Sequence, residues 1–130
     1  IHWECDEDIK TVVEIIHKEG KKAGLALTMK TALDDVKEVF KQMDAVLLLT
    51  ISEPGYSGQK FDIDGLKRIE QLNELPFRDH FRVCVDGGIN EKIISSVQVE
   101  DVVSGASVLN HSNPKQQILR LQTSGRYEVL

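Results

Sequence analysis

Residues 45–61, AVLLLTISEPGYSGQKF, join a buried-strand pattern to a glycine-rich loop. The run from Ala45 to Ile51 is almost continuously apolar, which is typical of a parallel strand covered on both faces. The loop over residues 53–59 follows directly, and helical periodicity over residues 62–75 comes next. This strand–loop–helix order predicts a unit of a parallel α/β fold.

The same alternation continues on both sides of this unit. Short apolar runs at residues 22–28, 81–85 and 102–103 alternate with helical patterns at residues 8–19, 32–43, 91–97 and from Asn113 onward. We expect Asp6 to cap the first helix and Asn113 the last, with Pro114 at its first position and Ile118, Leu119 and Leu121 facing inward. Residues 125–130 look like a tail. The pattern predicts one parallel sheet with helical cover and no internal domain boundary.

Composition narrows the possible partners. The chain has 130 residues and a net charge of -5, which argues against nucleic acid as the main partner. Its longest apolar run, residues 45–49, is too short to span a membrane, and no secretory leader is visible. Cys5 and Cys84 form no framework, so we expect two reduced thiols in a cytoplasmic protein.

The chemistry is expected where strands end. Working residues of parallel α/β proteins gather at the carboxyl ends of strands, and three of these ends carry glycine: Gly55 to Gly58, Asp86-Gly87-Gly88 and Gly105-Ala106. Glycine lets the backbone approach a ligand, and successive N–H groups can bind an anion. Each pattern alone is commonly a plain turn, but their succession predicts a phosphate-type site. His2 stands at a probable strand end and could face the same pocket, whereas the acidic residues 4–8 look like a solvated helix start.

Five stretches together resemble the ribulose-phosphate 3-epimerases, which are (β/α)8-barrel enzymes. They are IHWE (1–4), KEGKKAGLALTMKT (18–31), AVLLLTISEPGYSGQKF (45–61), VDGGIN (85–90) and VVSGAS (102–107). The resemblance starts at the end of the family's fourth strand. It implies that this α/β chain supplies the end of strand 4 through helix 8 of a TIM barrel. Residues 1–130 would then be the carboxyl-terminal portion of a single ribulose-phosphate-binding barrel domain, with the first strands upstream.

The resemblance also implies an activity. Family members interconvert ribulose 5-phosphate and xylulose 5-phosphate, a step of the pentose phosphate pathway, by proton transfer at C3 through an enediolate. Asp86 matches one of two acid/base aspartates and would also bind one divalent metal ion (Zn, Fe, Mn or Co). The second aspartate and both metal-binding histidines belong to the upstream strands, so we expect this polypeptide alone to be inactive. The phosphate-binding positions by match are Gly55, Tyr56, Ser57, Gly58, Gly87, Gly88, Gly105 and Ala106. A cytoplasmic homo-oligomer acting on a ketose phosphate is expected.

Several positions depart from the family pattern and indicate a divergent member. They are Met29-Lys30 for Asn-Pro or Lys-Pro, Leu49 for methionine, an extra Ser52, Ser57 for glycine and Ala106 for serine. Two other functions therefore stay open. One is a non-catalytic or differently specific phosphosugar-binding homologue, and the other is a different phosphate-binding barrel enzyme, such as a decarboxylase of a sugar acid phosphate. The metal-binding residues of the upstream strands would discriminate among them.

Overall fold

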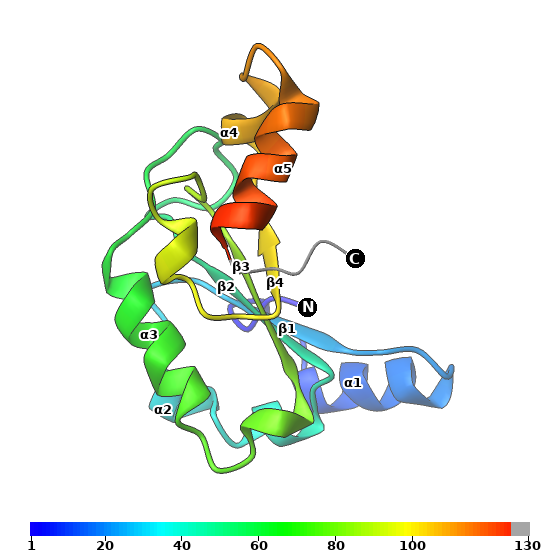
Figure 1. Ribbon diagram of the computed structural model, residues 1–130. Coiled ribbons are helices and arrows are strands. Elements are labelled where there is room, and N and C mark those ends of the chain that lie inside the picture. The colour runs from blue at the N-terminus through cyan, green and yellow to red at the C-terminus, as the bar shows by residue number, and fades with distance from the viewer. Residues whose placement is uncertain (126–130) are drawn as a thin grey trace.

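The computed structural model describes residues 1–125 and contains one parallel sheet (Figure 1). Its strands are β1 (Gly24–Leu27), β2 (Ala45–Leu49), β3 (Arg82–Asp86) and β4 (Asp101–Val103), in the order β1-β2-β3-β4. His2 forms a parallel bridge with Ala26, so residues 1–3 run along the outer edge of β1. The predicted parallel order and the predicted strand end at the amino terminus are both confirmed.

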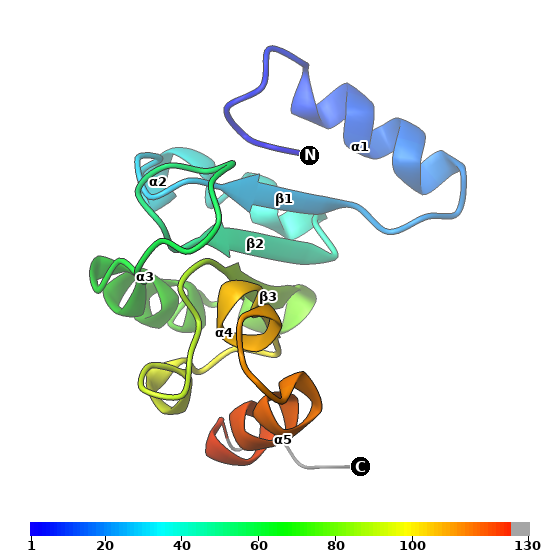
Figure 2. The same ribbon diagram turned by 90° about the horizontal axis from the view of Figure 1, so that it is seen from above.

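Eight helical segments connect and flank the strands within the described residues. They are α1 (Ile9–Lys18), α2 (Leu33–Val36), η1 (Val39–Gln42), α3 (Asp64–Asn73), η2 (Arg78–His80), η3 (Ile94–Ser96), α4 (Ala106–Leu109) and α5 (Pro114–Ser124). Seen from above, α1 lies beside β1 at one edge of the sheet, and α5 lies at the opposite edge (Figure 2). None of these helices is both long and apolar enough to cross a membrane.

The two faces of the sheet differ in burial. One face is completely buried under the helices and contributes Leu25, Leu27, Val46, Leu48, Val83 and Val85 to the core. On the other face Leu47 and Cys84 are half-buried, and Val103 is 45% exposed. In β2 itself every residue is buried or half-buried, and Leu49 on this second face is only 7% exposed, so the second face is covered less completely than the first but is not open to solvent along β2.

The predicted helix over residues 32–43 is broken into α2 and the 3-10 turn η1. Val36, Phe40 and Met43 are nevertheless all buried, so the apolar stripe was identified correctly although the helix is irregular. Residues 91–97 form only the 3-10 turn η3 and not the expected helix. The helix α4 was not predicted.

The helix ends show one confirmed cap and two wrong expectations. Asn113 caps α5 as predicted, with its Oδ1 accepting from the Gln116 N–H at 3.1 Å. The cap of α1 is Asp8, two residues later than expected. In α5 Leu121 is buried, but Ile118 and Leu119 are about half exposed. The remaining predicted tail, residues 126–130, lies outside the described residues.

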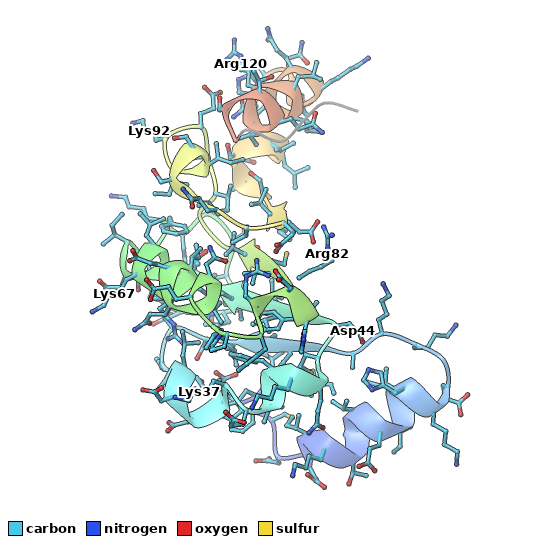
Figure 3. The ribbon with its side chains drawn as sticks, turned by 60° about the horizontal axis from the view of Figure 1, so that its bottom comes forward. Lys37, Asp44, Lys67, Arg82, Lys92 and Arg120 are labelled. Atoms are coloured by element: carbon cyan, nitrogen blue, oxygen red, sulfur yellow. The ribbon has the colours of Figure 1, made fainter. Side chains whose placement is uncertain are left out.

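Charged pairs join the amino-terminal ends of the strands. Asp44, just before β2, accepts from the Ala23 N–H at 2.7 Å and pairs with His17 at 3.0 Å. Arg82 opens β3, and its guanidinium contacts both oxygens of Asp101 at 2.8 and 2.9 Å (Figure 3). These contacts fix the start of each strand and leave the opposite end of the sheet to the loops.

Candidate functional site

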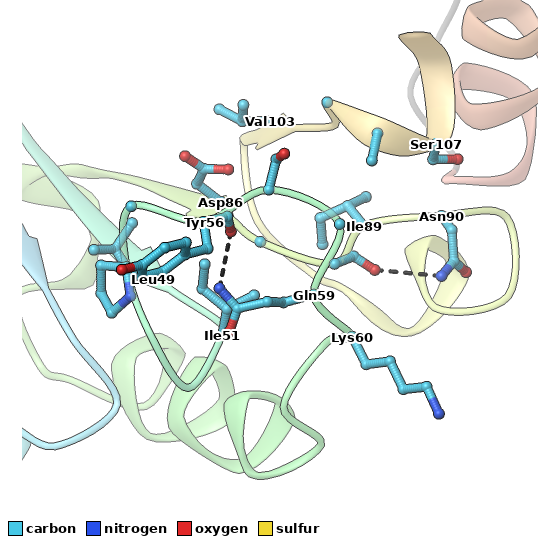
Figure 4. Close-up of a pocket in the computed structure, with 18 of the residues that line it drawn as sticks. Leu49, Ile51, Tyr56, Gln59, Lys60, Asp86, Ile89, Asn90, Val103 and Ser107 are labelled. Carbon is cyan, nitrogen blue, oxygen red and sulfur yellow. Dashed lines mark hydrogen bonds between the residues drawn. The ribbon is translucent and has the colours of Figure 1, made fainter. Parts of the chain in front are cut away.

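A pocket of about 690 Å³ opens at the carboxyl ends of the strands (Figure 4). Three loops form most of it: residues 54–60 after β2, residues 87–90 after β3 and residues 105–107 after β4. Leu49, Asp86 and Val103, the last residues of three strands, also line it, as does His2 at the edge of the sheet. The pocket is thus where parallel strands were expected to bring their ends together.

The pocket is lined by every residue assigned to a site from the sequence. These are Asp86, Gly55, Tyr56, Ser57, Gly58, Gly87, Gly88, Gly105 and Ala106. They come from loops that are far apart in the chain, from Gly55 to Ala106. The structure therefore brings the proposed acid/base residue and the proposed anion-binding amides to one place; that they bind a ligand stays a prediction.

Asp86 is held by its backbone while its carboxylate faces the pocket. The fully buried Thr50 donates its N–H to the Asp86 carbonyl at 2.8 Å and its hydroxyl to the Gly87 carbonyl at 2.8 Å. Within residues 1–125 the carboxylate itself accepts no hydrogen bond and forms no ion pair. A half-buried carboxylate fixed in position and free of protein partners is suited to act on a ligand.

The two glycines after Asp86 are required by space as well as by conformation. Gly87 and Gly88 have φ values of 124° and 71°, which residues that carry a side chain rarely adopt. A Cβ on Gly88 would lie 2.1 Å from the Phe61 nitrogen, and one on Gly87 would lie 2.6 Å from Ile51 Cγ2. The Asp-Gly-Gly sequence therefore allows the loop after β3 to pass against the loop after β2.

Gln59 organises the loop after β2. Its side-chain amide donates to the carbonyls of Glu53 and Tyr56, and its Oε1 accepts from the Glu53 N–H at 3.1 Å. Gly55 and Gly58 take φ values of 100° and 79° inside this turn, and the Tyr56 side chain is 69% exposed. Gln59 belongs to the quoted stretch 45–61, but its spacing alone does not distinguish a loop-bridging amide from a surface one.

The loop after β4 is tied to its neighbours by two hydroxyls. Ser104 donates to the Ile89 carbonyl at 2.9 Å, which links the β4 loop to the β3 loop. Ser107 Oγ accepts from the Gln117 side chain at 3.2 Å, so the hydroxyl that stands one place later than in the family pattern is already engaged. Gly105 and Ala106 line the pocket beside these two hydroxyls.

The charged groups of the pocket are few. Asp86 is the one carboxylate and Lys60 the one ammonium group among the lining residues, and the Lys60 side chain extends away from the loops (Figure 4). An anion bound here would rest mainly on backbone N–H groups. Behind the site, burial raises the pKa of the Cys84 thiol, and the nearby charges of Asp101 and Asp86 add to this effect.

The donor set does not complete a metal site within this chain. No group of three His, Cys, Asp or Glu side chains in residues 1–125 is close enough to hold a metal ion. Asp86 could supply one oxygen ligand, but a stable divalent site needs several donors. The expected metal is therefore not supported by these residues alone.

One expectation near the pocket is wrong. Glu4 is not simply part of a solvated helix start, because its Oε1 accepts from the Thr28 N–H and from the Thr28 hydroxyl, both at 2.9 Å. The Thr31 hydroxyl donates to the same oxygen. These partners lie at least twenty-four positions away in sequence, where no local spacing rule could reveal them.

Comparison with known proteins places these features in a family. The sequence model described as the "Ribulose-phosphate 3 epimerase family" matches residues 1–109. The ribulose-phosphate 3-epimerase of Candida glabrata is 31% identical over 132 residues, covering 98% of this chain and 52% of that protein. The enzyme of the same name from Bacillus subtilis is 27% identical, covering 95% of this chain and 59% of that protein. The chain thus spans a little over half the length of these relatives.

A solved structure supports the fold. The 3-hexulose-6-phosphate synthase of Salmonella typhimurium superposes with a TM-score of 0.69 at 17% identity, covering 92% of this chain and 57% of that one. At this identity the match concerns the fold alone. It confirms the predicted α/β class, with the described strands forming part of a (β/α)8 barrel.

Proposed function

The chain belongs to the ribulose-phosphate 3-epimerase family, and from this premise we propose that it forms the carboxyl-terminal part of an epimerase active on a ketose phosphate. The reaction we assign is the interconversion of ribulose 5-phosphate and xylulose 5-phosphate by proton transfer at C3. One observation carries the proposal: the Asp86 carboxylate and the backbone of three glycine-bearing loops line the same pocket.

The phosphate is held, in this proposal, by backbone N–H groups. The relevant residues are Gly55 to Gly58, Gly87-Gly88 and Gly105-Ala106, all of which line the pocket. Four of these glycines have a positive φ, which orients their backbone amides in a way that residues with a side chain rarely allow. Binding the phosphate there would anchor the sugar so that its carbon chain lies against Asp86.

Asp86 acts on the sugar as one of two acid/base groups. In one direction its carboxylate takes the proton from C3, and the electron pair of that C–H bond forms the enediolate with the neighbouring C2 carbonyl. A proton returned to C3 from the opposite face inverts the centre. Asp86 is the one carboxylate that lines the described pocket, and in this proposal the second group lies outside the described residues. We therefore expect this polypeptide alone to show no turnover.

Among the described residues, Asp86 is the one that we propose as a ligand of a divalent metal ion. When bound, such an ion stabilises the negative charge of an enediolate. Asp86 would contribute one ligand, and the other ligands would lie outside the described residues. A cytoplasmic location, the pentose phosphate pathway and a homo-oligomeric state follow from the same resemblance; the two free thiols, Cys5 and Cys84, are compatible with a reducing compartment.

The test is exchange of the C3 proton by the full-length protein. Ribulose 5-phosphate incubated in D2O should give xylulose 5-phosphate and acquire deuterium at C3, both visible by proton NMR. Binding of ribulose 5-phosphate without exchange would favour the non-catalytic phosphosugar-binding homologue. Failure to bind any ketose phosphate would contradict the phosphate site itself.

A further inference from the structure

His2 lines the pocket but has no part in the proton transfer assigned to Asp86. Its backbone is fixed to the edge of the sheet, since the Ala26 N–H donates to the Ile1 carbonyl at 2.7 Å and the Trp3 N–H donates to the Ala26 carbonyl at 2.9 Å. Its side chain is 54% exposed. An imidazole on a rigid strand end, open to the pocket, is available to a ligand rather than packed in the core.

The register of the sheet places His2 and Asp86 on the same face. His2 pairs with Ala26, Ala26 with Leu47, and Leu47 with Cys84. Asp86 stands two positions after Cys84 on β3, and side chains two residues apart on a strand point to the same face. Both side chains therefore rise from the side of the sheet that is covered less completely.

The Glu4 carboxylate lies beside the imidazole. Its Oε1 takes all three donors from Thr28 and Thr31, which leaves Oε2 turned toward His2 Nδ1 at 3.9 Å. Burial raises the pKa of Glu4, but the hydrogen bonds from Thr31 and Thr28 outweigh it and lower the pKa to about 2. An ionised carboxylate at this distance acts on the imidazole through its charge and not through a hydrogen bond.

The strand order indicates which part of a bound ketose phosphate would lie near His2. Across the mouth of the sheet the order is residues 1–3, β1, β2, β3 and β4. The proposed phosphate amides follow β2, β3 and β4, whereas His2 lies at the outer edge, beyond β1. A ketose phosphate held by its phosphate would extend past Asp86 toward His2.

We propose that His2 contacts the end of the ketose phosphate remote from the phosphate, and that Glu4 positions it. This inference rests on the proposed function, because it assumes a phosphosugar in the pocket. His2 hydrogen-bonds the C1 hydroxyl or the C2 oxygen through its ring, which adds affinity for the sugar and none for inorganic phosphate. Glu4 touches no ligand and is a positioning residue.

The experiment compares two ligands in the full-length protein. His2→Ala should raise KM for ribulose 5-phosphate about tenfold, the effect of one lost hydrogen bond, and should leave the inhibition constant of inorganic phosphate within about twofold. His2→Gln, which can still donate from a similar position, should recover part of this loss. His17→Gln is the matched control, because His17 pairs with Asp44 at the far end of the sheet and its replacement should change neither constant.

The role of Glu4 is tested by a double-mutant cycle. Glu4→Gln should raise KM in the wild-type background but have no further effect when His2 is already alanine. Additive effects would overturn the positioning role. An unchanged KM in His2→Ala, or equal losses for sugar and inorganic phosphate, would overturn the contact. Wild-type protein that fails to epimerise would instead contradict the proposed function, and calorimetric titration with ribulose 5-phosphate would then test His2 directly.

Discussion

In the part of the chain that the structure describes, charged side chains at the amino-terminal end of the sheet pair with one another, whereas the pocket carboxylate at the carboxyl end does not. At the amino-terminal end, charges meet one another: Arg78 donates to both oxygens of Glu100 at 2.7 Å, and Arg82 pairs with Asp101. At the carboxyl end the Asp86 carboxylate has no protein partner within the described residues, and glycine backbone lines the pocket around it.

This difference separates stability from function. Glu100 shows the first role, since it also accepts from the Val83 N–H at 2.7 Å and so joins the segment before β4 to β3. Polar groups satisfied by each other gain little from a ligand, whereas unpaired groups held by a rigid sheet are ready to bind one. Substitutions of the paired side chains should therefore change mainly the unfolding free energy, whereas substitution of the unpaired Asp86 should change turnover.

The largest expected effect comes from Asp86→Asn in the full-length protein. It keeps the shape but removes the base, so kcat should fall at least about 10²-fold. Asp101→Asn is the matched control, because Asp101 lies on the neighbouring strand at the opposite end and contacts Arg82. It should leave kcat within twofold in a steady-state assay. An unchanged kcat in Asp86→Asn would mean that Asp86 is only a turn residue.

Gly88→Ala should be next in size. Its Cβ would meet the backbone nitrogen of Phe61 at 2.1 Å, at a φ of 71°, so the two loops must separate. We expect a loss of about 2 kcal/mol in unfolding free energy and about tenfold weaker inhibition by inorganic phosphate. Gly24→Ala is the control, because Gly24 begins β1 at the end of the sheet away from the pocket and a Cβ there would come no closer than 3.6 Å to Ala45. Chemical denaturation measures the unfolding free energy, and inhibition kinetics measure the affinity for inorganic phosphate. Equal losses in the two variants would refute the steric explanation.

Glu100→Gln tests the other end of the sheet. It removes the charge that pairs with the largely buried Arg78 and weakens the bond from the Val83 N–H. We expect the unfolding free energy to fall by about 1 kcal/mol, and kcat and KM to stay unchanged. Urea denaturation and steady-state kinetics on the same preparation measure both. A change in KM as large as that of a pocket variant would contradict the separation of roles.

The sequence predicted the pocket because parallel strands must end at one edge. Asp86 and the glycines of three loops could be assigned to one site from strand ends alone, without any contact being known. The broken helix over residues 32–43 shows the limit of periodicity. Val36 and Phe40 repeat at helical spacing because both are buried, and burial does not require a regular helix between them.

Contacts between distant segments could not be predicted. Glu4 belongs to an acidic stretch whose composition is typical of a solvated helix start, and its partners Thr28 and Thr31 follow a strand in another part of the chain. Gln59 is similar, since an amide that bridges its own loop has no sequence signature. Folding, and not local pattern, decides which polar residue meets which backbone group.

The smallest effect concerns pH and Glu4. The hydrogen bonds from Thr31 and Thr28 outweigh burial and lower the Glu4 pKa from 4.5 to about 2. A lowered pKa in the folded state means that the stabilisation is complete above about pH 4.5 and is lost as the pH falls toward 2. Because Glu4 is partly exposed, we expect Glu4→Gln to cost about 1 kcal/mol at pH 6 and less at pH 3. Glu7→Gln, an exposed carboxylate of the same segment, is the control. Urea denaturation at both pH values decides the matter: a cost that stays constant would show that the threonine contacts do not depend on the charge of Glu4.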